Sequence, residues 1–378
     1  MPNAAVKAAT RGYSGGNLQE LPPSQHPKLF VSVRTSSKKD ESSDVLYETE
    51  VVDEPFGDGR FKPLDAQNLS SEINSPMTPI ASYDCISKAP IKVTGNRFGC
   101  ENENKEFSFN DLLPSGYVTI DAAYDPNEAR TFLLVLEVCS DIVKLFVVYR
   151  PNHDMGDNDT LQVSAGFPIE PSTSLRYSRI DYNFVNRELY LTLSEMEDIN
   201  APREAVLNTL SLPTDLSAEI TLQLNEILRF PGLFFRSFAI DPIRDIGFAT
   251  GRYTTDYLAD DESAGGDPTV FVFPLPTTSP GSASIYPRSI FTFSSDLFPS
   301  TTADPDICYV ALSDVAVDWE SGDVFVSGQE MSGRDDNGWC DVRRENVVYR
   351  IKTDSVGQSS AAIKYIENLD ANFDTSVV

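Results

Sequence analysis

Histidine is nearly absent from this sequence, which holds only His26 and His153 among its 378 residues. Two isolated histidines offer no basis for a Ser-His-Asp triad, a histidine-rich zinc site or a histidine proton shuttle. A glycine-rich phosphate loop is missing too, because Gly265-Gly266 stands among acidic residues that repel phosphate. The sequence therefore argues against catalysis by a serine triad, a histidine-bound zinc ion or a histidine shuttle, and against a phosphate-binding loop.

Cysteine is also scarce, and the five residues form no CxxC motif and no metal-ligand spacing. Cys139 stands in an apolar stretch without a basic neighbour, which is typical of a small core residue. The other four lie in or beside expected loops, where they either form two local disulfides or remain thiols in a reducing compartment. The disulfides would join Cys85 to Cys100 and Cys308 to Cys340.

Long apolar runs are missing as well. The longest, residues 142–149, is interrupted by Lys144 and is far shorter than the roughly 20 residues that a membrane-spanning helix needs. The N-terminus has no apolar signal-peptide core, and residues 1–27 are expected to form a flexible tail. Two glycosylation sequons, at Asn68 and Asn158, fit an exported glycoprotein. We expect no membrane insertion and an extracellular or cell-surface location.

Basic residues are outnumbered, since 57 acidic and 30 basic residues give a formal net charge of −27. A field of this sign repels phosphate backbones and anionic lipid, so we expect no nucleic-acid partner. The acidity itself has two interpretations. It either keeps the protein soluble, for instance in a salty medium, or it provides a surface that binds cations.

One pattern recurs in the chain: an apolar pair leads into an acidic or amide residue, a polar turn follows, and an apolar strand leaves the turn. Residues 239–251 are the clearest copy. The turn residues of the four copies are Asp125, Asn183, Asp241 and Asp318, spaced by 58, 58 and 77 positions. Such repetition indicates an architecture built from copies of one supersecondary unit.

Each copy is expected to contain four strands, the first of which leads into the turn. Alternating apolar residues and many β-branched and aromatic side chains predict the others. The second strands are placed at residues 131–138, 188–193, 246–250 and 323–327, and the third strands at 143–149, 205–212, 269–275 and 346–351. The fourth strands are placed at residues 160–165, 219–224, 289–294 and 361–366. Because helical periodicity is nearly absent, the sequence predicts an all-β protein.

Four-stranded units that repeat every ~40–60 residues are typical of a β-propeller, in which each twisted sheet buries both faces against its neighbours. The turn pattern and the segment Asn346-Val-Val-Tyr-Arg-Ile351 resemble the blades of the NHL, YWTD and lactonase-like propeller group over about residues 117–368. The WD, kelch and YWTD motifs themselves are missing. The resemblance implies a β-propeller of four-stranded blades, about five to seven in number with six favoured.

We expect a single propeller domain over residues 28–370. Residues 28–116 would supply one or two irregular blades, and a strand at residues 29–34 is the candidate for closing the ring with C-terminal strands. The regular blades are placed at residues 117–170, 171–230, 231–299 and 300–370.

Three acidic loops are candidate metal sites, because calcium takes several hard oxygen ligands from flexible loops. The ligands proposed for the first two are Asp154, Asp157 and Asp159 in one loop and Asp256, Asp260, Asp261, Glu262 and Asp267 in the other. The third loop holds Asp335, Asp336, Asn337 and Asp341. None matches the EF-hand pattern, and solvated turn residues are the alternative interpretation of each loop. Calcium is therefore the one cofactor that the sequence suggests.

The recurrent turn residues also have two interpretations. In an Asx-turn the side chain accepts backbone N–H groups of the following residues, which is a structural role. Alternatively, the carboxylates converge on a central channel and ligate a metal, as in the lactonase-like propellers. Recurrence in every copy favours the turn. Trp319 is expected to pack between blades, whereas Trp339 is either a contact residue in a loop or buried beneath that loop.

The preferred hypothesis is a non-enzymatic interaction or structural module that binds protein partners, or joins a larger assembly, through its acidic loops. It rests on the missing catalytic constellations and on loops of very different length, where such scaffolds carry recognition. The alternative is a calcium-dependent lactonase- or esterase-like hydrolase with an acidic site in the central channel. The acidic loop in residues 253–268 is the first place to look for function.

Overall fold

The computed structural model contains only β-strands as regular elements among the residues that it describes. These are the strands before residue 93 and most residues from 117 to 367, with gaps at 126–127, 129, 138–141, 150–161, 171–177, 195–203, 254–266, 277–286, 294–306, 320, 335–339 and 355–358. Side chains are described from Ile120 onward. This part of the chain has no helix long and apolar enough to cross a membrane. The all-β prediction is confirmed.

The N-terminal strands form sheet 1 and one separate pair. Sheet 1 has the order β1-β2-β3-β5 and consists of β1 (Ala4–Ala9), β2 (Lys28–Thr35), β3 (Ser43–Glu50) and β5 (Ser70–Pro76). The separate pair joins β6 (Ile80–Asp84) to β7 (Ala89–Lys92) in antiparallel fashion. Strand β1 lies within residues 1–27, for which the sequence predicts a flexible tail; residues 1–3 and 10–27 lie outside the described residues.

Four further sheets follow along the chain, each beginning with a strand that leads into a recurrent turn. Sheet 2 contains β8 (Tyr117–Asp125), β9 (Arg130–Glu137), β10 (Ile142–Tyr149), β11 (Gln162–Val163) and β12 (Phe167–Glu170). Sheet 3 contains β13 (Arg179–Asn183), β14 (Glu188–Ser194), β15 (Glu204–Leu210) and β17 (Asn225–Pro231). Sheet 4 contains β18 (Leu233–Asp241), β19 (Ile246–Tyr253), β20 (Thr269–Pro274) and β21 (Arg288–Thr292). Sheet 5 contains β22 (Ile307–Val317), β23 (Val324–Arg334), β24 (Cys340–Thr353) and β25 (Ser359–Glu367).

Two short strands cross from one sheet to another. Strand β16 (Leu222–Gln223) lies between β15 and β17 of sheet 3 but pairs in parallel with β12 of sheet 2. Strand β4 (Leu64–Asp65) lies between β3 and β5 of sheet 1 but pairs in parallel with β25 of sheet 5. In both cases the connection before the last strand of a sheet extends the outer edge of another sheet.

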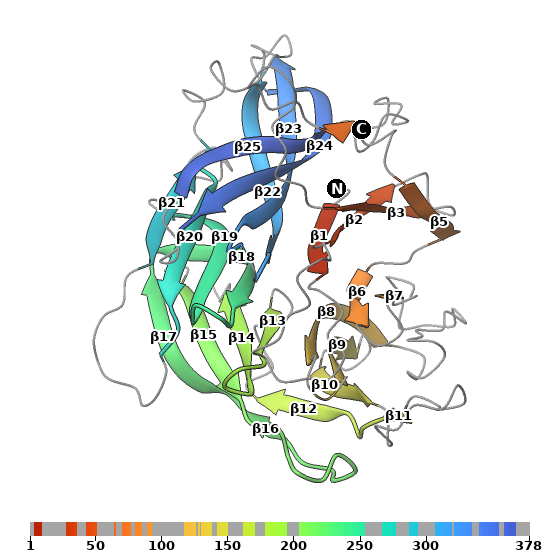
Figure 1. The fold of residues 1–378 in the computed structure, drawn as a ribbon. Coiled ribbons are helices and arrows are strands. Elements are labelled where there is room, and N and C mark those ends of the chain that lie inside the picture. Colours follow the sequence, from red (N-terminus) through yellow and green to blue (C-terminus); the bar gives the residue numbers. More distant parts are fainter. Residues whose placement is uncertain are drawn as a thin grey trace.

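The first strands of the sheets lie next to one another (Figure 1). Strand β8 contacts β13, β13 contacts β18, and β18 contacts β22. The series continues from β22 to β1, from β1 to β6, and from β6 back to β8. Each sheet is open in itself, but this series of contacts returns to its starting point.

Two strand predictions are wrong. Residues 211–221, which overlap the strand predicted at 219–224, contain no strand, and the fourth strand of sheet 3 is β17. The chain turns away from sheet 3 at Asp215, whose side chain accepts the N–H group of Ser217 at 2.9 Å. The segment at residues 29–34 pairs with β1 and β3, and it is β4 that pairs with a C-terminal strand. Which segments pair with one another depends on the free energy of pairing between segments that lie far apart in the chain. That free energy leaves no signal in the local sequence.

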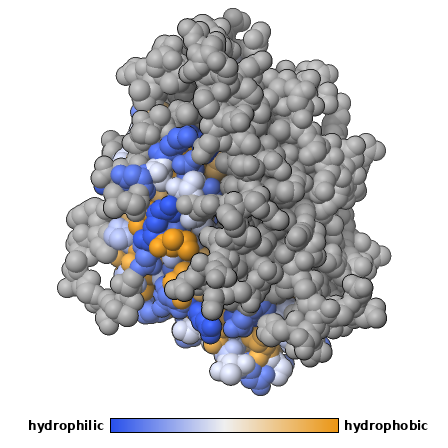
Figure 2. All heavy atoms as spheres, viewed as in Figure 1, coloured by the Kyte–Doolittle hydropathy of each residue, from blue (hydrophilic) through white to orange (hydrophobic). Residues whose placement is uncertain are grey.

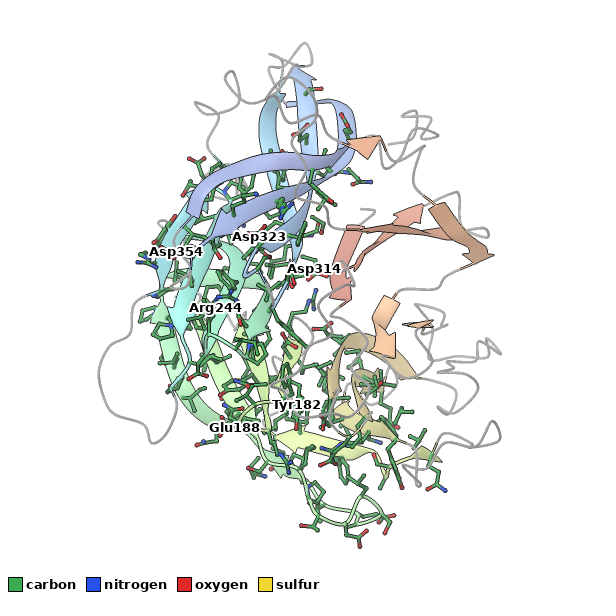
Figure 3. All side chains as sticks on the ribbon, viewed as in Figure 1. Tyr182, Glu188, Arg244, Asp314, Asp323 and Asp354 are labelled. Atoms are coloured by element: carbon green, nitrogen blue, oxygen red, sulfur yellow. The ribbon has the colours of Figure 1, made fainter. Side chains whose placement is uncertain are left out.

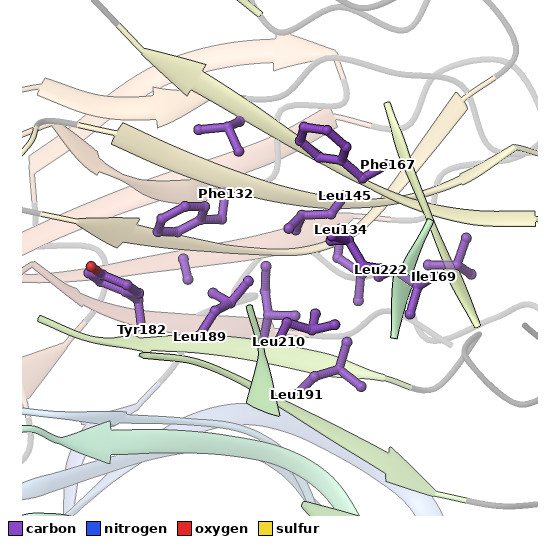
Figure 4. Packing of buried hydrophobic residues seen from close by; sticks show 14 of the residues in the cluster. Phe132, Leu134, Leu145, Phe167, Ile169, Tyr182, Leu189, Leu191, Leu210 and Leu222 are labelled. Atoms are coloured by element: carbon purple, nitrogen blue, oxygen red, sulfur yellow. The ribbon is translucent and has the colours of Figure 1, made fainter. Parts of the chain in front are cut away.

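The hydrophobic core lies between the faces of neighbouring sheets. Leu189 and Leu191 of β14 belong to the cluster between sheets 2 and 3, whereas Tyr190 belongs to the cluster between sheets 3 and 4. This alternation follows from the two-residue period of a strand. Figure 4 shows the cluster between sheets 2 and 3, in which the rings of Phe132 and Tyr182 have centroids 4.9 Å apart. A third cluster lies between sheets 4 and 5. Burial of each such side chain stabilises the fold by about 1.5–3 kcal/mol.

Candidate functional site

The recurrent turns are built by the side chain that ends each first strand. After β13, Asn183 Oδ1 accepts the N–H groups of the residues two and three positions on, at 3.0 and 3.2 Å. After β18, Asp241 Oδ1 accepts the two corresponding N–H groups, both at 3.0 Å. These are Asx-turns, so the structural interpretation is confirmed for both residues.

The other two turn residues hold their turns with different partners. Asp125 accepts the N–H group of Glu128 at 3.4 Å and the guanidinium of Arg130 at 2.8 Å. Asp318 Oδ2 accepts the hydroxyl of Ser321 at 2.6 Å, and the Asp318 carbonyl accepts the N–H group four residues on at 2.7 Å. All four turn residues are buried, with exposed fractions of 0 to 7%.

Asp241 is buried and forms an ion pair in addition to its turn. Its Oδ2 accepts Arg244 Nη1 at 2.6 Å. Burial nevertheless raises the pKa of Asp241 above its ordinary value, although Arg244 and the backbone donors act against this rise. Burial and the charge of Glu188 also raise the pKa of Asp245. The desolvation of this turn therefore outweighs its favourable contacts in setting the two pKa values.

Neighbouring turns are tied to one another. Asn183 Nδ2 donates to Asp245 Oδ1 at 3.4 Å and joins the turn of sheet 3 to that of sheet 4. Arg244 Nη1 donates to the carbonyl of Trp319 at 3.1 Å and joins the turn of sheet 4 to that of sheet 5. Figure 3 labels Tyr182, Arg244 and Asp323 close to these turns. The turn ends of three first strands thus form one connected region.

Trp319 contacts residues from two other sheets in this region. Its ring centroid lies 4.7 Å from that of Phe184, and its Nε1 donates to the carbonyl of Ile240 at 3.1 Å. Phe184 follows β13, Ile240 belongs to β18, and Trp319 follows β22. The side chain packs against the cluster between sheets 2 and 3 and against the cluster between sheets 4 and 5. The expected packing role of Trp319 between sheets is therefore confirmed. Pro242 takes the equivalent position in sheet 4 and is buried.

Three aspartates of the first strands reach a neighbouring first strand. The bonds join Asp121 to the N–H group of Ile180 at 3.0 Å, Asp181 to the N–H group of Ile240 at 2.7 Å, and Asp314 to the hydroxyl of Ser237. Sequence reasoning missed these residues. The available signal was an aspartate two or four positions before the turn residue, inside an otherwise apolar strand. Each carboxylate accepts a hydrogen bond from a neighbouring sheet, so these side chains hold the sheets together.

Among the ligands proposed for the first two acidic loops, Asp267 alone lies within the described residues. It is exposed, and its carbonyl accepts the hydroxyl of Thr269 at 2.9 Å. The others lie outside the described residues and stay predictions: Asp154, Asp157, Asp159, Asp256, Asp260, Asp261 and Glu262. In the part of the chain that the structure describes, no group of three or more His, Cys, Asp or Glu side chains could hold a metal ion.

Several other predictions concern side chains outside the described set. These belong to the five cysteines, to Trp339 and to the third acidic loop, in which Asp341 lies within β24 but only its backbone is described. The two disulfides and the contact role of Trp339 therefore stay predictions.

Comparison with known proteins adds no family to this picture. A scan against protein-family models found no match, and a search of curated proteins found no similar sequence. The fold and the turns define the chain as an all-β protein of packed open sheets. Polar side chains of the first strands connect one sheet to the next.

Proposed function

We propose that the chain is a six-bladed β-propeller that works as a non-enzymatic interaction module. The contact series β8–β13–β18–β22–β1–β6–β8 supports six blades around one axis. Sheets 1 to 5 are five of these blades, and the β6–β7 pair belongs to the sixth. Radial packing of this kind covers both faces of each sheet and leaves only short edges, which suits the apolar clusters between sheets 2, 3, 4 and 5.

The observation that carries the non-enzymatic role is the use of the inner carboxylates as connectors. A metal-dependent hydrolase of the lactonase-like kind needs such side chains to converge on one ion. Here Asp121, Asp181 and Asp314 bind the neighbouring first strand. Phe184 and Trp319 meet at the turn end of the same strands. Recognition is then left to the loops that the scaffold holds in place.

A basic protein surface is the partner that the charge of the chain favours. With a net charge of −27, association through exposed carboxylates is steered by long-range attraction and weakened by salt. On the face shown in Figure 2, the described apolar residues form small groups among hydrophilic ones. This described part of the face suits a charged contact better than a large apolar interface. We place this contact outside the cell or within a larger assembly, at the acidic loops.

Mild purification of the chain from its source, followed by mass measurement in low and high salt, tests the proposal. We expect a defined complex at about 0.1 M salt that dissociates at about 1 M, where charges are screened within a few ångströms. The complex should weaken in a variant that changes the second acidic loop to amides at Asp256, Asp260, Asp261, Glu262 and Asp267. The control is Asp215→Asn, which removes an exposed carboxylate on the connection between β15 and β17 and should leave the complex intact.

Two results would overturn the proposal. One is a chain that remains monomeric at both salt concentrations. The other is calcium-dependent hydrolysis of esters or lactones that a chelator abolishes and that the loop variant lacks, which would establish the hydrolase. Thermal unfolding with added calcium separates the cases further, because a tightly bound ion raises the melting temperature.

A further inference from the structure

Two apolar side chains are exposed on the recurrent turns of sheets 3 and 4. Val185 is 51% exposed and Ile243 is 55% exposed. Val185 donates its N–H group to Asn183 Oδ1 at 3.0 Å, and Ile243 donates its N–H group to Asp241 Oδ1 at 3.0 Å. Each is the second residue after the turn residue of its sheet. The two side chains therefore occupy equivalent positions on neighbouring turns.

The turn itself does not require an apolar residue at this position. The hydrogen bond to the Asx side chain uses only the backbone N–H group, which every residue except proline provides. The sequence places Asn127 and Glu320 at the same position of the other two recurrent turns; both lie outside the described residues. Valine and isoleucine also favour strands over turns. Some contact outside the turn therefore has to account for Val185 and Ile243.

The two turns are fixed relative to each other. Asn183 Nδ2 on one turn donates to Asp245 Oδ1 on the other at 3.4 Å. Phe184, which directly precedes Val185, is buried, and its ring centroid lies 4.7 Å from that of Trp319. A surface that rests on packed rings needs little ordering when a partner binds, so more of the binding free energy is retained.

Carboxylates accompany the apolar pair on these turns. Glu188 is exposed, and its Oε2 accepts the hydroxyl of Tyr190 at 2.7 Å and Asn186 Nδ2 at 3.0 Å. These two bonds hold the carboxylate in place. Asp245 lies close enough that the charge of Glu188, after burial, contributes to the rise of its pKa. Two carboxylates from neighbouring turns thus share one negative field.

The arginines of the same turns do not balance this charge. Arg244 is paired with Asp241 at 2.6 Å. Arg187 is exposed, but it stands against both Glu188 and Asp245, so carboxylates outnumber arginines on the two turns. A second copy of the chain, with its net charge of −27, would bring the same negative field and be repelled. Charge complementarity therefore favours a basic partner.

We propose that this surface, which we call the turn face, binds a segment of a partner protein that carries lysine or arginine beside apolar side chains. The apolar side chains of the partner cover Val185 and Ile243, and its cations meet Glu188 and Asp245. This rests on the proposed role as an interaction module and adds a second contact to it. Strand β19 leaves the turn and ends at Tyr253, so the second acidic loop begins at the opposite end of sheet 4.

Two fluorescent synthetic peptides with equal numbers of lysines test the turn face. One alternates lysine with leucine, the other alternates lysine with serine, and fluorescence anisotropy measures the affinity of each for the full chain. We expect the wild type to bind the lysine-leucine peptide at least about fivefold more tightly. Val185→Ser combined with Ile243→Ser should abolish this preference. Ile220→Ser, at a position that is 41% exposed, is the matched control and should keep it.

The charged part of the turn face is tested separately. Glu188→Gln should weaken the binding of both peptides by about two- to threefold and leave the preference for leucine unchanged. Urea unfolding checks that each variant folds. If the serine pair does not fold, Val185→Thr combined with Ile243→Thr retains the β-branched shape and provides the same comparison.

Equal binding of the two peptides to the wild type, or an unchanged preference in the double variant, would overturn the turn face as a docking surface. The salt-dependent complex through the acidic loops would still stand. The amide variant of the second acidic loop should keep the preference for leucine, and its loss there would place the apolar contact at that loop and likewise refute the turn face. A chain that is monomeric in its source extract but keeps the preference would refute the contact at the acidic loops and support the turn face.

Discussion

The fourth residue after the turn residue adopts a left-handed backbone conformation in three of the recurrent turns. The φ angle is 62° at Arg187, 55° at Asp245 and 82° at Gly322. Residues with a side chain are disfavoured there by roughly 1–2 kcal/mol, whereas glycine adopts the conformation readily. At Asp245 the hydrogen bond from Asn183 offsets part of this conformational cost. The turn geometry, set by the Asx residue, therefore overrides the preference of the residue that follows.

Replacing Gly322 by alanine is expected to destabilise the protein by about 2 kcal/mol, because the backbone conformation disfavours a side chain. The new Cβ would also meet Arg244 Cζ at 2.8 Å, and Arg244 is held by Asp241 and by the carbonyl of Trp319. Arg187→Gly is the matched reverse change at an exposed position, and it should leave stability unchanged or raise it by up to about 1 kcal/mol. Urea unfolding measures both, and equal losses would contradict the argument from backbone conformation.

The buried charge of Asp241 gives stability a specific dependence on pH. Because burial raises the pKa of Asp241, the folded state binds the proton of this carboxyl more tightly than the unfolded state. The contribution of this carboxyl to the stability of the folded state is therefore fully present below the ordinary pKa of 3.8. It is lost as the pH rises through the higher pKa of the folded state. Urea unfolding of the wild type and of Asp241→Asn, from about pH 4 to about pH 8, should show the wild type losing stability relative to the variant as the pH rises.

Asparagine is a fair reference for this measurement because Asn183 fills the same position in sheet 3 and builds the same turn. Asp241→Ala removes both the turn acceptor and the partner of Arg244, so it should cost about 3 kcal/mol at neutral pH. A wild type that gains stability over Asp241→Asn with rising pH would show that the ion pair with Arg244, and not burial, dominates at this carboxylate.

At the scale of elements, the connection between β15 and β17 covers the edge of a neighbouring sheet. Leu222 is 3% exposed and joins the cluster between sheets 2 and 3. The N–H group of Ala165 donates to the carbonyl of Leu216 at 3.0 Å, and that of Leu224 donates to the carbonyl of Glu170 at 3.4 Å. An uncovered edge strand invites association with other chains. The connection thus protects sheet 2 as well as stabilising it.

Leu222→Ala should therefore destabilise the protein by about 2–4 kcal/mol, as expected for a buried leucine. Ile220→Ala, two residues earlier at a position that is 41% exposed, should stay within about 0.5 kcal/mol of the wild type. The comparison uses thermal or urea unfolding, with limited proteolysis of residues 211–224 as a second measurement. Equal stability of the two variants would mean that the connection does not pack on sheet 2 in solution.

Local patterns in the sequence predicted the strands of sheets 2 to 5 well where alternation was strong, as at Leu189 and Leu191. They also predicted the Asx-turns, because that geometry is encoded in a few adjacent residues. Strand β16 and the β4–β25 pairing could not be predicted, since their partners lie far away in the chain. The connecting role of Asp181 was missed for the same reason: a carboxylate in a strand does not reveal which distant N–H group it accepts.

At the scale of the whole molecule, Phe184 and Trp319 join sheets that are not neighbours. Sheets 3 and 5 stand on opposite sides of sheet 4 in the series of first strands. Stacked sheets are spaced by about 10 Å, so a flat stack would keep the outer two roughly 20 Å apart. Ring centroids 4.7 Å apart therefore indicate that the turn ends of the first strands converge, as they would around the axis of the proposed propeller.

A double-mutant cycle on Phe184→Leu and Trp319→Leu tests this convergence in solution. Each single change should destabilise by about 1–3 kcal/mol, and the pair should show a coupling energy of about 0.5–1.5 kcal/mol, because the second loss is smaller once the ring contact is gone. Phe230→Leu with Trp319→Leu is the control, since Phe230 belongs to the separate cluster between sheets 3 and 4; these changes should add. Additive effects for Phe184 and Trp319 as well would mean that sheets 3 and 5 do not meet. The argument for a ring of blades from the contact at the turn ends would then fail.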